Sequence, residues 1–520
     1  MKWNITKKYL VFPVNINTSQ KKLFFREEGE LLIDLDIKLD NITPAFWAYV
    51  DVKRFIGKTL DLEVVPEMTL TFEEADTMDL DGLWQENYRP QVHFTVKNGW
   101  NNDPNGMIYQ DGIYHMFYQY NPCEPWWNNM HWGHAISEDM LHWEEQDVAL
   151  FPDKQGTMFS GSAITDFRNV SGLGKDGKVP MLLYYTAAGN TSELSKGRKF
   201  TQCLAYSLDG GKTFEKYEGN PVVAHFEAEN RDPKVVWVEE IERYIMVIFL
   251  NDDRYLMLES QDLLHFRVYQ KISLKGDAEC PDLFFLQYNG KKVWVLIGAS
   301  DRYVIGRFTK DGFVIESTEK KLSYGVGYAA QSFSGMEDER VVRVWWDRMM
   351  QIPKDGRFTS HMSIPTDMSL ENINDTVYLC AQPIMELESL RGEEQVMRGF
   401  VLNAPMKFEA DKKPVEMILE MPYDAAVVLE FDIFGEKLIC DMTNNQIRYK
   451  TVKMPISVDS KKVKLHMIVD RSIIEVYADG GKFCFAEMLL CDDNLPRIIL
   501  STDKEVNIDH LEWYSLQSIH

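Results

Sequence analysis

The chain has 520 residues, of which 45% are hydrophobic and 26% are charged, proportions typical of a folded globular protein with roughly two to four domains. Its 56 Lys and Arg residues against 80 Asp and Glu residues give a net charge of −24, which argues against nucleic acid and anionic membranes as partners and is compatible with a neutral ligand. Seven cysteines with no CxxC pair predict neither a zinc site nor a complete disulfide framework.

The first residues, MKWNITKKYLVFPVNI, hold only a short apolar run and no small-residue cleavage site, so they do not resemble a signal peptide. No window approaches the ~18 apolar residues that a membrane-spanning helix needs. We therefore expect a cytoplasmic protein, or an extracellular or periplasmic one if the sequence was trimmed at its start.

Residues 1–88 carry the pattern of half-buried strands. Residues 33–40 alternate strictly between apolar and charged side chains, and residues 59–64 repeat that alternation, which is the period of an antiparallel strand with one face buried. We predict an N-terminal β-rich accessory region whose role is left open.

Residues 89–388 show repeated turns. The pattern Ser-x-Asp-x-Leu-His-aromatic occurs at 137–143 and 260–266, with a looser copy at 207–214. A turn of this kind would stand at one equivalent corner of a repeated four-stranded unit. At ~60 residues per unit, this stretch predicts a five-bladed β-propeller.

Residues 389–400 are rich in Glu and Arg and are predicted to be a polar linker with some helical character. Residues 401–520 alternate again, as in residues 472–477, and predict a C-terminal β-sandwich. The expected fold class is therefore all-β, with the propeller followed by the sandwich and preceded by the small N-terminal β domain.

Carboxylates are the candidate catalytic groups, because phosphate-binding loops, nucleotide fingerprints, HExxH and GxSxG motifs are absent from the sequence. Asp103 and Asp232 each precede a proline, which favours extended backbone, and Glu279 lies in Glu-Cys-Pro-Asp. Taken singly, each is more typical of a turn or a surface acid. No metal is predicted, because the histidines at 131, 134 and 142 lack a pattern of ligating carboxylates.

The three acids lie in three of six motifs that follow one another along the chain. The chain resembles glycoside hydrolase family 32, the invertases, inulinases and levanases, in Trp100-Asn-Asn-Asp-Pro-Asn-Gly106, Tyr114-His-Met-Phe-Tyr-Gln-Tyr-Asn-Pro122, Met130-His-Trp-Gly-His-Ala-Ile-Ser137, Phe159-Ser-Gly-Ser162, Arg231-Asp-Pro233 and Glu279-Cys-Pro-Asp-Leu-Phe284. Residues 469–477 resemble the family's C-terminal sandwich.

The resemblance implies a glycosidase that removes terminal β-fructofuranosyl residues from sucrose, fructo-oligosaccharides, inulin or levan with retention, through a covalent fructosyl-enzyme. It implies Asp103 as the nucleophile, Asp232 as the transition-state stabiliser and Glu279 as the general acid/base. The residues that it implies for substrate binding are Asn102, Gln119, Trp127, Phe159, Ser160, Arg231 and Trp346. The partner would be a neutral fructose-containing saccharide, and no cofactor is implied.

Two alternatives stay open. Ser323 and Gly327 stand where the family usually carries acidic residues, which keeps a fructosyltransferase, forming oligosaccharides or a difructose anhydride, as a second hypothesis. A non-catalytic glycan-binding propeller is a third. The sequence leaves open whether the enzyme prefers β-2,1 or β-2,6 linkages and whether it acts from the chain end or within the chain. It also leaves open the oligomeric state, which could be a homo-oligomer.

Overall fold

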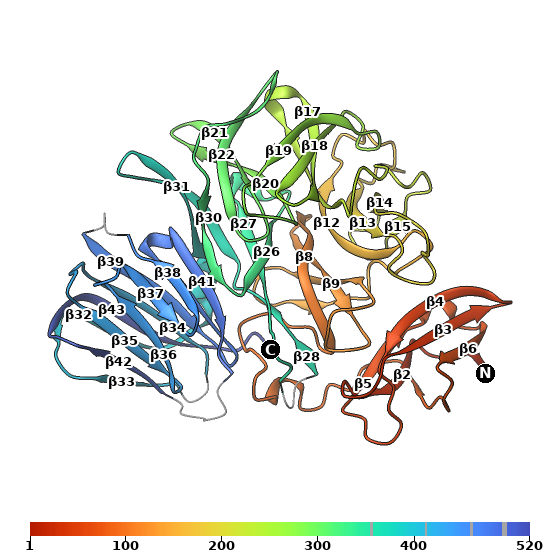
Figure 1. Ribbon diagram of the computed structural model, residues 1–520, viewed down its shortest axis with the longest axis horizontal. Coiled ribbons are helices and arrows are strands. Elements are labelled where there is room, and N and C mark those ends of the chain that lie inside the picture. Colours follow the sequence, from red (N-terminus) through yellow and green to blue (C-terminus); the bar gives the residue numbers. More distant parts are fainter. Residues whose placement is uncertain (354–356, 411–412, 458–460, 491–496) are drawn as a thin grey trace.

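The computed structural model describes residues 1–353, 357–410, 413–457, 461–490 and 497–520 (Figure 1). Strands dominate these residues, and the helices are short 3-10 turns, so the predicted all-β class is confirmed. The 3-10 helices are η1 (Lys53–Phe55), η2 (Leu83–Gln85), η3 (Glu239–Ile241), η4 (Glu337–Glu339), η5 (Met385–Leu390) and η6 (Asp479–Gly481). Within the described ranges, no helix is long and apolar enough to cross a membrane.

The N-terminal region forms two small sheets around one apolar core. The first has the order β1 (Lys2–Asn4), β6 (Thr59–Val65), β3 (Lys21–Glu27) and β4 (Glu30–Ile37), and the second has the order β5 (Phe46–Asp51), β2 (Tyr9–Val14) and β7 (Glu73–Ala75). The alternation predicted at residues 59–64 is strand β6, which buries Leu60, Leu62 and Val64 in that core and exposes the residues between them. Period-2 patterning therefore decides which face of this strand is covered.

Five further sheets lie in the middle of the chain, in sequence order. The first sheet consists of β8 (Gly99–Gln110), β9 (Ile113–Asn121), β10 (His131–Ser137) and β11 (Glu144–Glu145), and the second of β12 (Thr157–Thr165), β13 (Met181–Ala188), β14 (Thr201–Ser207) and β15 (Glu215–Lys216). The third consists of β16 (Arg231–Val238), β17 (Arg243–Asn251), β18 (Arg254–Ser260) and β19 (Arg267–Ser273), and the fourth of β20 (Asp282–Tyr288), β21 (Lys291–Ile297), β22 (Arg302–Thr309) and β23 (Gly312–Ile315), with β24 (Lys320–Lys321) paired to β22. The fifth consists of β26 (Gly327–Ser332), β27 (Val342–Asp347), β30 (Thr366–Ile373) and β31 (Thr376–Pro383), with β29 (His361–Met362) paired to β27.

These sheets are the blades of a closed propeller. The first strand of each blade contacts the first strand of the next, in the order β8, β12, β16, β20 and β26, and β26 contacts β8 to close the ring. Strand β28 (Phe358–Thr359), which follows the last blade's second strand, adds to β8 of the first blade. Closure leaves the innermost strands around one axis, where side chains from different blades can meet.

The repeated turn lies at one equivalent corner of three blades, between the third and fourth strands. In the first blade, Asp139 accepts hydrogen bonds from the backbone N–H groups of Leu141 and His142. Asp209 and Asp262 hold the corresponding turns of the next two blades. The aromatic residue that ends each copy packs on a neighbouring apolar core, so the repeat marks the blades as predicted.

The C-terminal region is a sandwich of two sheets around an apolar core. One sheet has the order β25 (Ser323–Gly325), β41 (Phe483–Met488), β40 (Ile473–Ala478), β39 (Lys462–Val469), β34 (Val415–Pro422), β43 (Val506–Leu516) and β32 (Arg391–Leu402). The other has the order β33 (Met406–Glu409), β42 (Arg497–Thr502), β35 (Val428–Ile433), β36 (Glu436–Asp441), β37 (Gln446–Tyr449) and β38 (Val452–Pro455).

The linker predicted at residues 389–400 is wrong, because these residues form the end of η5 and most of strand β32, which pairs with β43. Strand β32 is the edge of its sheet and is largely exposed. Charged side chains are common on edge strands, where they discourage pairing with other chains. The Glu- and Arg-rich composition therefore reflects an exposed edge strand.

The propeller and the sandwich share a buried polar contact. Asp470, between β39 and β40, accepts hydrogen bonds from the backbone N–H groups of Gln91 and Val92, and its Oδ2 lies 2.9 Å from His93 Nδ1. All of these groups are buried. The sandwich is thus fixed to the segment that leads into β8, while Figure 1 shows the N-terminal domain on a different flank of the propeller.

Candidate active site

The site lies where the inner strands of several blades meet, and backbone irregularities present its side chains. The β8–β9 register shifts between Asn101 and Pro104, the β12–β13 register shifts between Phe159 and Gly161, and the β16–β17 register shifts between Arg231 and Lys234. A bulge redirects the side chains within it. The three shifts contain Asn102 and Asp103, Ser160, and Asp232.

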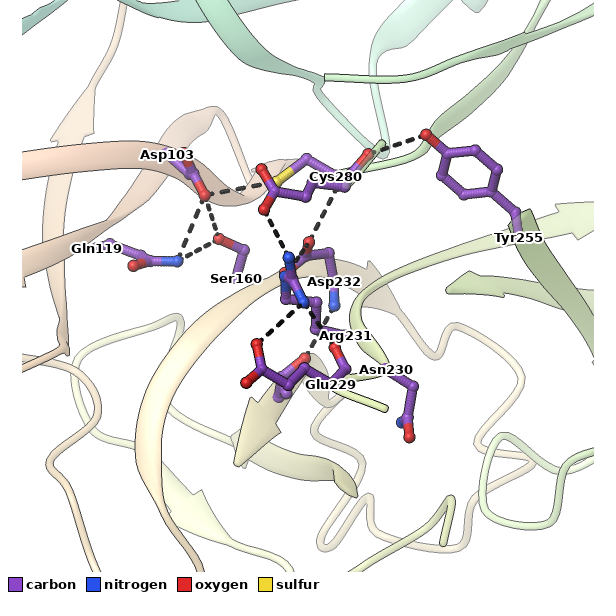
Figure 2. Close-up of polar contacts among 12 residues, drawn as sticks. Asp103, Gln119, Ser160, Glu229, Asn230, Arg231, Asp232, Tyr255 and Cys280 are labelled. Atoms are coloured by element: carbon purple, nitrogen blue, oxygen red, sulfur yellow. Dashed lines mark hydrogen bonds and ion pairs between the residues drawn. The ribbon is translucent and has the colours of Figure 1, made fainter. Parts of the chain in front are cut away.

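The three predicted acids, Asp103, Asp232 and Glu279, form one cluster, called the acid cluster below. Asp103 is buried, with 9% of its surface exposed. Its Oδ2 accepts a hydrogen bond from Ser160 Oγ at 2.6 Å and a longer one from Gln119 Nε2 at 3.4 Å, both drawn as dashed lines (Figure 2). The side chain of Asn102 accepts a hydrogen bond from the Asp103 backbone N–H at 2.6 Å. Asn102, Gln119 and Ser160, all predicted from the family resemblance, therefore surround the predicted nucleophile.

Cys280 joins Asp103 to Asp232. Its backbone N–H donates to Asp232 Oδ2 at 3.0 Å, and its Sγ lies 3.4 Å from Asp103 Oδ2 (Figure 2). The Asp232 backbone N–H donates to Thr186 Oγ1 at 2.9 Å. Asp232, Glu279 and Cys280 all have positive φ angles, of 63°, 60° and 33°. Such strained backbone occurs at functional sites, where the surrounding structure supports it.

Glu279 is held at both carboxylate oxygens. Arg231 Nη2 lies 2.5 Å from Oε1, and the Tyr328 hydroxyl donates to Oε2. The Glu279 side chain is 35% exposed, in contrast to the buried Asp103. Arg231 Nε also lies 3.6 Å from Asp232 Oδ2, so one guanidinium lies between two of the three acids.

The electrostatics of the cluster raise the pKa values of both aspartates. Burial, together with the charges of Asp232 and Glu279, raises the pKa of Asp103 to about 7, although the hydrogen bond from Ser160 opposes the rise. Burial raises the pKa of Asp232 to about 6, and the charge of Arg231 opposes it. Asp232 is therefore mostly ionised at neutral pH, whereas Asp103 changes protonation there.

The predicted aromatic residues lie around this cluster. Trp127 packs edge-to-face on Phe159, with ring centroids 6.4 Å apart, and 51% of its surface is exposed. Trp346, on β27, packs edge-to-face on Trp100 and Tyr328, with centroids 5.9 and 6.5 Å apart. Trp346 thus reaches the acid cluster through Tyr328, the residue that contacts Glu279.

Sequence reasoning missed three side chains that contact the acids, Tyr328, Thr186 and Tyr255, and assigned no role to Cys280. Tyr328 lies directly after Gly327, in the stretch where Ser323 and Gly327 depart from the family pattern. Cys280 follows Glu279 directly, so its position was a usable signal. Thr186 lies on β13 in a run of buried residues, with no local pattern that marks it.

His131, His134 and His142, the three histidines considered as metal ligands, have separate partners. His131 Nδ1 contacts the Asn129 carbonyl, His134 Nε2 lies 3.0 Å from His115 Nδ1, and the exposed His142 pairs with Asp139. The described residues contain no group of three or more His, Cys, Asp or Glu side chains that could hold a metal ion.

Comparisons with known proteins match most of the chain. The model "Glycosyl hydrolases family 32 N-terminal domain" matches residues 93–383, and "Glycosyl hydrolases family 32 C terminal" matches residues 403–515. The chain is 32% identical over 495 residues to the levanase of Bacillus subtilis (strain 168), covering 85% of this chain and 71% of that protein. It is 29% identical over 510 residues to an extracellular exo-inulinase of Aspergillus niger, covering 82% and 94%.

The fold is also found among solved structures. The exo-inulinase of Aspergillus awamori aligns with a TM-score of 0.74 at 24% identity, covering 84% of this chain and all of that one. A β-fructofuranosidase of Schwanniomyces occidentalis, solved with fructosyl-erythritol, aligns with a TM-score of 0.72 at 24% identity, covering 85% of this chain and all of that one. At this identity the likeness establishes the shared fold.

Proposed function

The chain belongs to glycosyl hydrolase family 32, and from that premise we propose that it hydrolyses terminal β-fructofuranosyl residues of sucrose, fructo-oligosaccharides or fructans such as inulin and levan. The observation that carries the proposal is the connected cluster of Asp103, Asp232 and Glu279, joined through Cys280 and Arg231. The names of the matched relatives, levanase and exo-inulinase, support a fructose-containing substrate.

In this proposal Asp103 attacks the anomeric carbon, C2, of the terminal fructose as the glycosidic bond breaks. The ionised carboxylate forms a covalent fructosyl-enzyme, and water later releases fructose with net retention. Ser160 and Gln119 donate to the same oxygen, Oδ2, and so fix the rotation of the carboxylate. They also favour its ionised form, because hydrogen bonds to a charged group stabilise the charge.

Glu279 supplies the proton that the leaving oxygen needs, and then removes a proton from the attacking water. A carboxyl with this double role must keep its orientation in both protonation states. The Tyr328 hydroxyl can donate a hydrogen bond to the carboxylate and accept one from the carboxylic acid, so its contact with Oε2 suits both states. Arg231 holds the other oxygen.

Asp232 contributes charge and hydrogen-bond acceptors to the bound sugar. Its Oδ2 accepts a hydrogen bond from the Cys280 N–H, and a carboxylate offers several acceptor positions, which fructose hydroxyls can use. Its negative charge would stabilise the oxocarbenium-like transition state. Arg231, lying between Asp232 and Glu279, limits the repulsion between these two acids.

The test is incubation with sucrose, inulin and levan followed by chromatography of the products. Free fructose as the released product supports hydrolysis of terminal residues. Longer or cyclic products would indicate fructosyl transfer instead, and saccharide binding without turnover would indicate a glycan-binding propeller. Asp103→Asn and Glu279→Gln are the matched controls, and each is expected to lower kcat by at least about 10³-fold, equivalent to about 4 kcal/mol of barrier.

A further inference from the structure

The N-terminal β domain has no counterpart in the matched family regions, since residues 1–92 lie outside both of them. In Figure 1 this domain, drawn in red, lies beside the first two blades, drawn in orange and yellow. Its strand β4 is the edge of a four-stranded sheet. An edge strand presents N–H and C=O groups that need partners, and here a loop of the propeller provides them for one residue, Asp36.

The first contact is a two-way hydrogen bond with the loop between β9 and β10. Asn129 Oδ1 accepts from the backbone N–H of Asp36 at 2.8 Å, and Asn129 Nδ2 donates to the Asp36 carbonyl at 2.8 Å. One carboxamide therefore continues the hydrogen-bonding pattern of β4 in place of another strand. Asn129 has a φ of 48°, a conformation that Asn adopts more readily than most residues.

The same loop also enters the core of the N-terminal domain. Cys123 is fully buried within that domain's apolar cluster, although it belongs to the propeller sequence. Gln20 Nε2 donates to Glu124 Oε1 at 3.3 Å. Cys123, Glu124 and Asn129 of this loop therefore contact the N-terminal domain.

A second contact reaches the loop between β13 and β14 in the next blade. The backbone N–H groups of Glu193 and Leu194 donate to Asp34 Oδ2. Asp34 and Asp36 point to the same side of β4, and Lys22 lies 2.8 Å from the Asp36 carboxylate and 4.0 Å from that of Asp34. Strand β4 therefore connects the loops of two adjacent blades.

The first of these loops carries two exposed tryptophans. Trp126 is 42% exposed and Trp127 is 51% exposed, and Asn121 Nδ2 donates to the Trp126 carbonyl at 2.7 Å. The Trp127 ring packs on Phe159, whose neighbour Ser160 donates to Asp103. Flat aromatic faces next to hydrogen-bonding groups are well suited to contact with sugar rings.

We propose that the N-terminal β domain is a positioning element for saccharide binding, in which β4 fixes Asn129 and its loop and thereby the Trp126–Trp127 pair beside the acid cluster. The saccharide part of this inference rests on the proposed function. Because Asp103 and Glu279 are held by residues of the propeller itself, the domain acts on substrate affinity and leaves the chemical step almost unchanged.

The first test measures the loop without any substrate. Hydrogen exchange followed by mass spectrometry is compared for the wild-type protein, Asn129→Gly, which keeps the positive φ accessible but removes the carboxamide, and Glu63→Gln, a control in an exposed ion pair of the same domain. We expect faster exchange over residues 122–130 in Asn129→Gly alone. Unchanged exchange there overturns the positioning role. Asn129 Nδ2 also donates to Asn121 Oδ1 at 3.2 Å, so Asp36→Pro tests the contact from the domain side. It removes the N–H that Asn129 Oδ1 accepts and leaves Asn121 unchanged, and proline is tolerated on an edge strand. Unchanged exchange over residues 122–130 in Asp36→Pro likewise overturns the positioning role.

The second test measures the consequence for the substrate. We expect Asn129→Gly to raise KM on the fructan that the wild type cleaves by about three- to tenfold, with kcat within about twofold. In a double-mutant cycle with Trp127→Ala, the effect of Asn129→Gly on KM should vanish, because the loop then has no aromatic face to position. Full additivity, or an unchanged KM, refutes the link to binding. A wild type that cleaves none of the sugars refutes the proposed function, while the exchange experiment still decides the positioning role.

Discussion

Asp103→Asn should make the protein more stable at pH 8, because the buried carboxylate is held in a site that disfavours its charge. The pKa of Asp103 is raised from 3.8 to about 7. A carboxyl whose pKa is higher in the folded than in the unfolded protein destabilises the fold once it must ionise. The loss begins above the unfolded pKa, grows as the pH rises to about 7, and is constant beyond it.

The magnitude follows from the two pKa values. At pH 8 the raised pKa of Asp103 costs the folded protein about 4 kcal/mol, and at pH 5, where the folded protein keeps Asp103 protonated, it costs about 1 to 2 kcal/mol. Asparagine is neutral at both pH values and has nearly the same shape. The stability gained by Asp103→Asn should therefore be about 2 to 3 kcal/mol larger at pH 8 than at pH 5.

Thermal unfolding of both proteins at pH 5 and pH 8 is the assay. For a domain of this size, about 2 °C accompanies each kcal/mol, so the variant should melt about 4–8 °C above the wild type at pH 8, with a smaller gap at pH 5. Asp139→Asn is the opposite control. Its carboxyl is held by hydrogen bonds from the backbone and side chain of His142, which lower its pKa to about 2 despite partial burial, so this change should not stabilise the protein at either pH. The reasoning would be refuted if the melting temperature of Asp103→Asn did not exceed that of the wild type, or if the difference between them did not depend on pH.

Three further outcomes follow from the contacts of the site and of the domain interface. Ser160→Ala removes a hydrogen bond that favours ionised Asp103, so the acidic limb of the kcat/KM profile should move about one pH unit towards alkaline pH; an unmoved limb contradicts this assignment. Tyr328→Phe removes the contact with Glu279 Oε2 and should lower kcat about 10- to 100-fold with little change in KM; a change confined to KM would instead place Tyr328 in substrate binding. Asp470→Ala leaves the buried His93 and two backbone N–H groups without their acceptor and should cost about 3–5 kcal/mol in thermal or urea unfolding, while the folded enzyme keeps its kcat; an unaltered unfolding midpoint would contradict the interdomain role.

Much of the fold was predictable because it depends on local chemistry. In the turns of the blades, Asp139 and Asp262 bond to backbone groups only two or three residues away, so the pattern is visible in any short window of sequence. Likewise, the alternation of β6 requires only that one face be buried. Strand β32 was mistaken for a linker because an exposed edge strand carries the same charged residues as a solvated connection.

The sequence alone predicted the all-β class, the blade repeat and three candidate catalytic acids, because each prediction depends on contiguous residues and on the order of short motifs. Only the tertiary structure decided what surrounds those acids. Tyr328 meets Glu279 across 49 residues, and Asn129 meets Asp36 across 93, and such pairs are set by ring closure and domain packing. The same packing buries Asp103 and raises its pKa, since desolvation is a property of the assembled fold and not of any segment.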